Sequence, residues 1–162
     1  MTAEIRAFFE QYRDAFDRLD GDAVARLYAV PSGIASDTGY EHWPAYAPIR
    51  ENMIALCDLY RANGYLSATF EPGAFIAQGE GCAVADIAWN IERRGAEAPW
   101  RFSTTYNLMR TAEGWRVLLC TAYSEKRLGV RIGGVPTQDM PVVCSTFELL
   151  SVVPASAEPV IP

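Results

Sequence analysis

Near the start of the chain, apolar residues recur every three or four positions and the residues between them are polar. Thr2 suits a helix N-cap, and the pattern behind it predicts an amphipathic helix. A break at Gly21 is expected to end this helix, and Asp22 to cap a short second helix that includes Tyr28. The apolar positions of the first helix are Ile5, Phe8, Phe9, Tyr12, Phe16 and Leu19.

A third helix is predicted from about Pro48 to Ala62, where Asn63-Gly64 stops it. Between the second and third helices, residues 33–36 are predicted to form a short strand. Residues 37–44 are predicted to form a polar-aromatic loop. The apolar face of the third helix comprises Ile49, Met53, Leu56, Cys57 and Tyr60.

The second half of the chain changes to long apolar segments separated by glycine-containing turns. Segments linked in this way predict an antiparallel meander. Helices first and a meander afterwards define an α+β order, with three N-terminal helices packed on an antiparallel sheet. The predicted strands are residues 65–78, 82–92, 100–110 and 115–126.

Composition fits one domain with one core, since half of the 162 residues are hydrophobic. We expect residues 1–127 to form this domain. Residues 128–162, rich in proline and glycine, are expected to form a C-terminal extension. Within this extension, residues 142–153 are apolar and β-prone, so they would add a strand or pack on a partner chain.

Charge and residue usage exclude several classes of function. A net charge of −6 with a single lysine argues against nucleic-acid binding, which needs clustered basic residues. Four scattered cysteines and one histidine give no metal-ligand cluster, so neither a metal nor another cofactor is expected. There is no apolar stretch long enough for a membrane span and no signal-peptide pattern, which predicts a cytoplasmic protein.

Two local motifs carry a family resemblance. Phe9-x-x-Tyr12-x-x-Ala15-Phe16, followed by Asp20-Gly21-Asp22 and Leu27-Tyr28, resembles the opening helical pair of the nuclear transport factor two-like superfamily. Glu113-Gly114-Trp115-Arg116-Val117 resembles its last hairpin, and the resemblance spans residues 4–127. It implies a cystatin-like cone, in which a strongly curved sheet and the helices enclose one small-molecule pocket.

Within this superfamily the chain is similar to SnoaL-like cyclases and ketosteroid isomerases. The alignment with the isomerases places Tyr12 at their oxyanion donor and Asp37 near their general base. Tyr106 stands where they carry a protonated aspartic acid. The resemblance implies a cofactor-independent isomerase, dehydratase or cyclase acting on an apolar carbonyl or hydroxyl compound. Asp37 or His42 would move the proton, while Tyr12 and Tyr106 would stabilise oxyanion charge.

Each of these residues also has a simpler interpretation. Tyr12 lies on an apolar helix stripe and fits a plain core position. Asp37 equally fits a turn-forming aspartate, and His42 fits a solvated loop residue. Asp86 is assigned to the outer face of the sheet, with a cavity-facing side chain as the alternative.

Hydroxyl groups among apolar side chains favour a pocket over a closed core. The strand positions 85, 87, 89 and 91 are assigned to the cavity, as are 102, 104, 106 and 108, and 119, 121 and 123. Together with the helices, these strands give the predicted ligand-binding residues Phe16, Tyr28, Trp43, Met53, Trp89, Thr104, Leu108, Thr121 and Tyr123.

The expected partners are a small apolar or amphipathic ligand and a second copy of the chain. The outer sheet face, with Val84, Asp86, Ala88 and Thr105, is expected to form a homodimer interface. The alternative functions are a non-catalytic ligand-binding domain and a dimerisation domain of the same fold.

Overall fold

The computed structural model describes residues 1–36, 39–95 and 98–123, which form three helices and one six-stranded sheet. The sheet order is β2-β1-β6-β5-β4-β3. The elements are α1 (Ala3–Asp17), α2 (Gly21–Ala25), β1 (Tyr28–Ser36), β2 (Gly39–Trp43), α3 (Tyr46–Ala62), β3 (Tyr65–Gln78), β4 (Cys82–Arg93), β5 (Trp100–Thr111) and β6 (Gly114–Tyr123).

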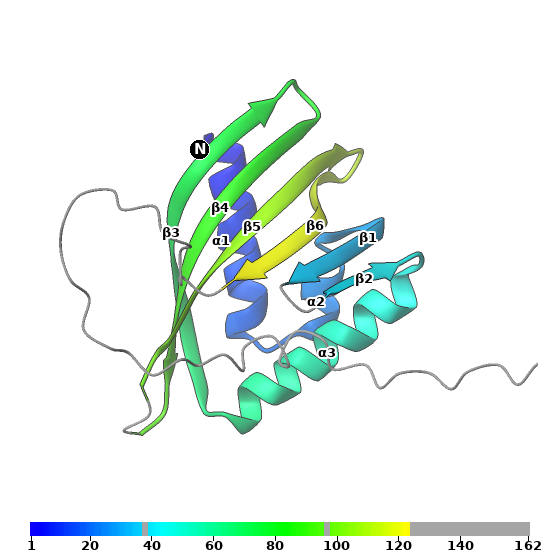
Figure 1. The fold of residues 1–162 in the computed structure, drawn as a ribbon. Helices are drawn as coiled ribbons and strands as arrows, with labels where there is room; N and C mark the ends of the chain where they lie inside the picture. Colours follow the sequence, from blue (N-terminus) through cyan, green and yellow to red (C-terminus); the bar gives the residue numbers. More distant parts are fainter. Residues whose placement is uncertain (37–38, 96–97, 124–162) are drawn as a thin grey trace, which may run out of the picture.

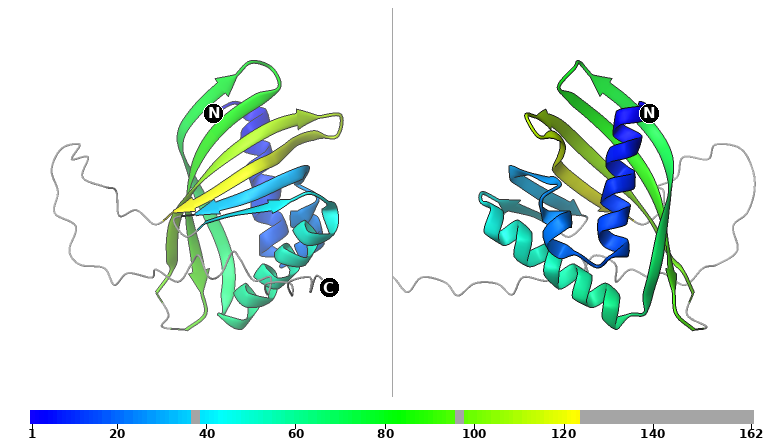
Figure 2. Two further views of the ribbon diagram at one scale, coloured as in Figure 1. Left: turned by 45° about the vertical axis from the view of Figure 1, so that its right-hand side comes forward. Right: turned by 180° about the vertical axis from the view of Figure 1, so that it is seen from behind.

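The sheet curves around α1, and α3 crosses the end of the sheet beneath β1 and β2 (Figures 1 and 2). This α+β arrangement agrees with the predicted class, but two details of the prediction were wrong. The third helix follows β1 and β2, so it lies mid-chain and not in an N-terminal block. In addition, β1 pairs with β6 in parallel, so the sheet is not antiparallel throughout.

The first helix forms as its sequence predicts. The Thr2 hydroxyl accepts a hydrogen bond from the Ile5 backbone N–H at 3.3 Å, satisfying one free donor of α1. The cap of α2 differs from the prediction, because the Asp20 carboxylate accepts from the Ala23 N–H at 2.9 Å. Asp22 instead forms an ion pair with Arg50 of α3.

Gly21 permits close packing of α2 on α3. A β-carbon at this position would lie only 2.6 Å from the Ile54 Cα, which is too close for any other residue without movement of the backbone. Gly21 therefore opens α2 and sets its distance from α3, whereas the sequence pattern assigned it only the break after the first helix.

Residues 39–43 form the edge strand β2 within the segment that was predicted as a loop. Tyr28, predicted to lie in the second helix, is the first residue of β1. A β-carbon at Gly33 would meet the Tyr40 ring at 2.7 Å, so Tyr40 packs across the bare backbone of the neighbouring strand. This packing holds together a hairpin whose sequence carries little strand signal.

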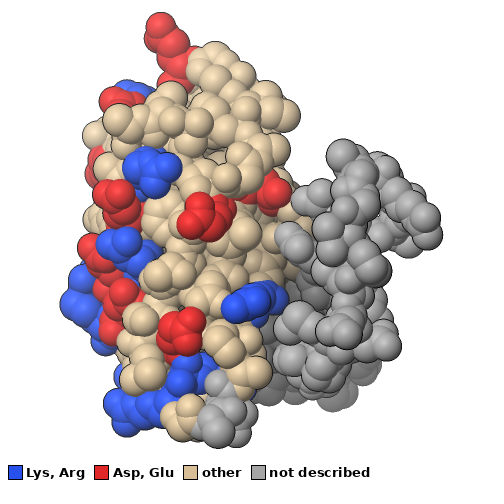
Figure 3. All heavy atoms as spheres, turned by 90° about the vertical axis from the view of Figure 1, so that its left-hand side faces the viewer, with Lys and Arg blue, Asp and Glu red and all other residues tan. Residues whose placement is uncertain are grey.

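Buried and exposed residues alternate along β4, as predicted. Ala85, Ile87, Trp89 and Ile91 point into the core, whereas Asp86 lies on the outer face. There its carboxylate accepts hydrogen bonds from the hydroxyls of Thr105, at 3.1 Å, and Tyr123. The outward assignment of Asp86 is therefore confirmed. Figure 3 shows acidic and basic side chains gathered along one edge of the face it draws, with fewer across its middle.

The predicted inward face of β6 was wrong. The register of β5 with β6 shifts between Asn107 and Leu108, which leaves one extra residue in β6. Because side chains alternate with period two, one extra residue reverses the faces. Thr121 pairs with Thr105 and lies with Tyr123 on the outer face, and the buried residues of β6 are Val117, Cys120 and Ala122.

Among the described residues, no helix is long and apolar enough to cross a membrane.

Candidate functional site

A cavity of about 40 Å³ lies between the concave face of the sheet and the helices. This volume holds about three or four water molecules, at roughly 10–15 Å³ each by the same measure. No lining residue is charged. The lining residues are Tyr12 and Phe16 of α1, Met53, Leu56 and Tyr60 of α3, and, from the strands, Tyr28, Ile34, Tyr65, Ala68, Trp89, Ile91, Phe102, Thr104, Tyr106 and Cys120.

Seven of these residues were predicted as catalytic or ligand-binding, and the structure brings them together from five elements. They are Tyr12, Phe16, Tyr28, Met53, Trp89, Thr104 and Tyr106. The helical residues come from the predicted apolar stripes of α1 and α3. Those of β4 and β5 come from the predicted inward phase of each strand.

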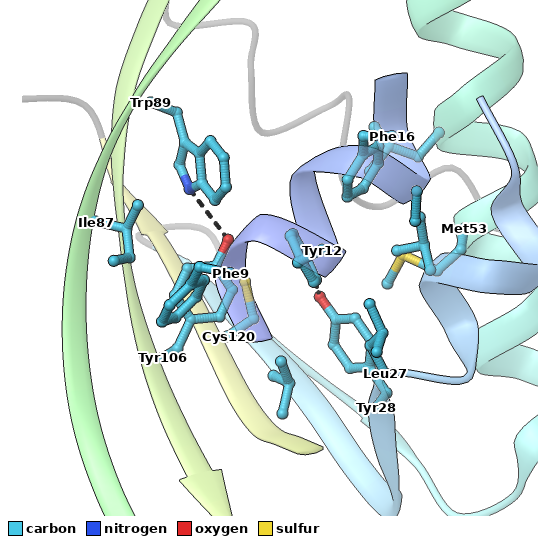
Figure 4. Close-up of a cluster of buried hydrophobic side chains, with 14 of the residues drawn as sticks. Phe9, Tyr12, Phe16, Leu27, Tyr28, Met53, Ile87, Trp89, Tyr106 and Cys120 are labelled. Carbon is cyan, nitrogen blue, oxygen red and sulfur yellow. Dashed lines mark hydrogen bonds between the residues drawn. The ribbon is translucent and has the colours of Figure 1, made fainter. Parts of the chain in front are cut away.

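Three phenols line the cavity, and their hydrogen bonds form two separate pairs (Figure 4). The Tyr12 and Tyr28 hydroxyls are hydrogen-bonded at 3.0 Å. The indole N–H of Trp89 donates to the Tyr106 hydroxyl at 3.2 Å. The Tyr12 and Tyr106 rings lie edge to face with centroids 5.6 Å apart. The three phenols therefore lie close together, with hydrogen bonds in two pairs, Tyr12 with Tyr28 and Trp89 with Tyr106.

Burial keeps these phenols protonated. Desolvation is the largest cause that raises the pKa of Tyr12, Tyr28 and Tyr106 well above the usual value, because a phenolate would lose its hydration. Repulsion between the neighbouring groups raises each pKa further. All three residues are neutral hydrogen-bond donors at physiological pH.

Cys120 adds a thiol next to the Tyr28 hydroxyl. Burial raises the pKa of this thiol to about 12, and the contact with Tyr28 acts in the opposite direction. A protonated, buried thiol is a poor nucleophile, so Cys120 contributes a weak hydrogen-bond acceptor and not a reactive group.

Several predicted site residues lie away from the cavity. His42 is exposed. Its partner in β1 is Gly33, which lies on the opposite face from the inward-facing Ile34. His42 stacks on Tyr40, with ring centroids 6.4 Å apart, and its exposure fits the simpler interpretation of a solvated residue. Trp43 and Leu108 are buried but do not line the cavity, and Trp43 packs behind the Tyr28 ring at 5.9 Å.

Asp37, the predicted general base, lies outside the described residues, as does the extension from residue 128. Among the lining residues that the structure describes, none is a carboxylate or a histidine. Within this part of the chain there is also no group of three or more His, Cys, Asp or Glu side chains that could hold a metal ion. What the described cavity provides is neutral hydrogen-bond donation inside an apolar, aromatic wall.

Sequence reasoning missed one polar residue in the core beside the cavity. Asn52 of α3 is fully buried, and neither the nitrogen nor the oxygen of its carboxamide has a hydrogen-bond partner among the described residues. Ser32 Oγ and Trp43 Nε1 are also buried without such a partner. The signal was present in the sequence, because Asn52 interrupts the apolar stripe of α3 between Ile49 and Leu56.

The curved sheet, the crossing helix and the enclosed cavity define a protein of the cone-shaped, cystatin-like class. A family model described as an NTF2-like protein family, DUF6841, matches residues 3–125, and the chain belongs to this family. The predicted membership of the nuclear transport factor two-like superfamily is thereby confirmed.

Solved structures agree with this assignment at the level of the fold. A cystatin-like protein of unknown function from Nostoc punctiforme is 18% identical, with a TM-score of 0.62, and the match covers 79% of this chain and 81% of the other. An NTF2-like protein from Novosphingobium aromaticivorans is 19% identical, with a TM-score of 0.61 and coverages of 78% and 82%.

An NTF2-like superfamily protein from Salmonella enterica is 20% identical, with a TM-score of 0.55 and coverages of 81% and 95%. At identities this low the comparison shows a shared fold, and it carries no information about activity. A comparison with curated proteins found no match to the chain.

Proposed function

We propose that this chain binds a small, mostly apolar compound that carries one oxygen able to accept a hydrogen bond, such as a ketone. The observation that carries the proposal is the group of three neutral phenols in a cavity without charged lining residues and with a mostly apolar, aromatic wall. In such a site, an apolar ligand surface is stabilised by contact with the surrounding wall, and the phenols donate a hydrogen bond to one ligand oxygen. A charged ligand would find no opposite charge on the described wall.

The size of the cavity limits the ligand. An apolar cavity of about 150 Å³ is needed to hold a benzene-sized molecule, and this one measures about 40 Å³. A one-ring compound therefore enters only if side chains move, and Met53 is the most adaptable lining residue because its chain is unbranched. A steroid-sized ligand would require a much larger rearrangement.

Catalysis is the second candidate, and it depends on a base. Neutral donors in a dry cavity stabilise the oxygen charge that develops when a proton leaves the carbon next to a carbonyl. We propose Asp37 as the base, by its resemblance to the general base of ketosteroid isomerases. The reaction would then be an isomerisation, dehydration or cyclisation. Without such a base, the same cavity serves a non-catalytic binding protein.

Ligand-observed NMR with two probes of equal shape tests the binding proposal. Cyclopentanone has a carbonyl where methylenecyclopentane has a carbon–carbon double bond. We expect the protein to bind cyclopentanone in preference, because only the ketone accepts a hydrogen bond. Binding of neither compound, to the wild type or to a Met53→Ala variant with an enlarged cavity, would overturn the proposal.

Exchange of ligand protons with heavy water distinguishes a catalytic protein from a non-catalytic binding protein. In heavy water, a base in the cavity removes a proton next to the carbonyl of cyclopentanone, and solvent returns a deuteron. We expect catalysed exchange with the wild type and its loss in Asp37→Asn, while the affinity for cyclopentanone is retained. Equal exchange in both proteins would exclude Asp37 as the base. Binding without any catalysed exchange would identify a binding protein.

A further inference from the structure

We infer that the ligand of this cavity carries a second neutral polar group, such as a hydroxyl, and that Ser32, Trp43 and Asn52 bind this group when the cavity widens toward α3. The inference rests on the proposed ligand-binding function and deepens it, because it assigns a second polar end to the ligand. Its test is separate, since it compares two ketones that differ only at that end.

Three buried side chains beside the cavity have polar atoms without a hydrogen-bond partner among the described residues. These atoms are Ser32 Oγ, Trp43 Nε1 and both polar atoms of the Asn52 carboxamide. Each residue is at most 3% exposed, so bulk water does not satisfy them. Buried polar groups in native proteins are nearly always paired, and each exception needs an explanation. One ligand group that bonds to all three side chains explains them together.

Ser32 and Trp43 lie directly opposite each other in the antiparallel pair of β1 and β2. Opposite residues share a face of the sheet, with their β-carbons about 5 Å apart. This is the inward face, because Ile34, two positions after Ser32, lines the cavity. Two positions along a strand span about 7 Å. The Trp43 ring also packs on that of Tyr28, another lining residue, with centroids 5.9 Å apart. The pair therefore lies just behind the cavity wall.

Asn52 faces the same region from α3. Arg50 and Ile54 mark the side of this helix that packs on α2, through the ion pair with Asp22 and the close approach of Gly21. Asn52 is two positions from each, about 160° around the helix, so it points away from α2. The strands β1 and β2 contact α3, and its first turns lie beneath them (Figure 1). Asn52 therefore points toward these two strands.

Met53 separates this polar group of side chains from the cavity. It lines the cavity and directly follows Asn52 in α3. A ligand larger than about 40 Å³ needs more space, and the unbranched Met53 side chain can move to provide it. A ligand group that enters there meets donors from Trp43 and Asn52 and acceptors from Ser32 and Asn52. A hydroxyl matches this set because it both donates and accepts, whereas an ionised group would find no opposite charge on these three residues.

The test compares two ketones of nearly equal shape, 3-hydroxycyclopentanone and 3-methylcyclopentanone. NMR titration measures both affinities in a Met53→Ala background, in which the cavity is already widened. We expect the hydroxyl compound to bind more tightly. This preference should fall roughly fivefold in Asn52→Leu and in Ser32→Ala, the scale of one net hydrogen bond. Asn52→Leu removes a buried group without a partner, so a lost preference does not reflect a weakened fold.

Thr104→Val is the matched control. Thr104 is a buried hydroxyl residue of the same cavity, but it lies on β5, so the preference should not change. A preference that is unchanged in both Asn52→Leu and Ser32→Ala overturns the inference, as does one that is lost in Thr104→Val. Tighter binding of the methyl compound also overturns it. If Met53→Ala binds neither ketone, the proposed function itself fails.

A crystal structure of Met53→Ala with 3-hydroxycyclopentanone gives an independent check. We expect the ligand hydroxyl within about 3.2 Å of polar atoms from at least two of Ser32, Trp43 and Asn52. A ligand hydroxyl that lies elsewhere, with water molecules bonded to these side chains instead, would contradict the assignment.

Discussion

This core contains two kinds of buried polar side chain. The Tyr12 and Tyr28 phenols are hydrogen-bonded to each other and the Tyr106 phenol to the Trp89 indole, whereas the carboxamide of fully buried Asn52 has no hydrogen-bond partner among the described residues. A buried polar group without a partner costs about 1–3 kcal/mol of stability. Asn52 is therefore the residue whose replacement is most informative about this core.

We predict that Asn52→Leu raises the free energy of unfolding by about 1–3 kcal/mol, because leucine has a similar shape and no polar atoms to desolvate. Asn63→Leu is the matched control, since the Asn63 amide donates to the Leu59 carbonyl at 2.9 Å and its loss should be destabilising. Urea denaturation of both variants measures the difference. A destabilised Asn52→Leu protein would show that the carboxamide has a partner in solution.

At the residue scale, the sequence predicted which side chains meet but not how they interact. Tyr12 and Tyr106 were predictable because each sits on the inward face of a regular element, where periodicity determines direction. The hydrogen bond between Tyr12 and Tyr28 was not, because it joins positions sixteen residues apart through the tertiary fold. The same limit applies to Cys120, which lies one position from the residues that were assigned to the cavity.

At the scale of elements, a single carboxylate joins the end of α1 to β3. Asp17 accepts hydrogen bonds from the Tyr65 hydroxyl at 2.7 Å and from the Ala68 backbone N–H at 2.9 Å. Both donors lie near the start of β3, and Tyr65 and Ala68 also line the cavity. Asp17 therefore holds the helix and the strand on either side of the cavity in register.

We predict that Asp17→Ala lowers the free energy of unfolding by about 1.5–3 kcal/mol, the range for hydrogen bonds to a charged group. Asp14→Ala is the control on the same helix. Among the residues that the structure describes, its carboxylate pairs only with the neighbouring Arg13, in a largely exposed ion pair that contributes about 1 kcal/mol or less. Thermal and urea unfolding compare the two. Equal effects would show that the contacts with Tyr65 and Ala68 contribute nothing measurable.

The strands show where sequence periodicity fails. The bounds of β3 were predicted in full and those of β4 and β5 to within one residue, because their long alternating runs end at glycine turns. β2 was missed, since five residues containing Gly39 and Glu41 carry little strand propensity and the Tyr40 ring holds the hairpin through Gly33. In β6, the extra residue at the bulge reversed the phase after Leu118, and no local signal marks a bulge.

For the molecule as a whole, the outer sheet face remains a proposed homodimer interface. It carries half-buried Val84 and exposed Ala88 among hydroxyl groups, with the Asp86 carboxylate between them and Glu71 paired with Ala88. We predict that light scattering at micromolar concentration reports twice the mass of the chain. We also predict that Ala88→Arg shifts this mass to that of one chain. Gln11→Arg, on the exposed side of α1, is the control and should leave the mass unchanged. A monomeric wild type contradicts the proposal.

The buried phenols also predict how stability depends on pH. Their folded-state pKa values lie above the unfolded value of about 10, so below pH 10 both states keep the protons and stability does not change on their account. Above it the unfolded chain loses protons that the folded one retains. The free energy of unfolding should therefore fall with rising pH, by about 1.4 kcal/mol per pH unit for each such tyrosine. Urea denaturation between about pH 8 and 11 measures the slope.

Tyr28→Phe removes one of these groups, so its slope should be shallower by about that amount. An unchanged slope would mean that Tyr28 ionises equally in the folded and unfolded states, and hence that its hydroxyl is open to water.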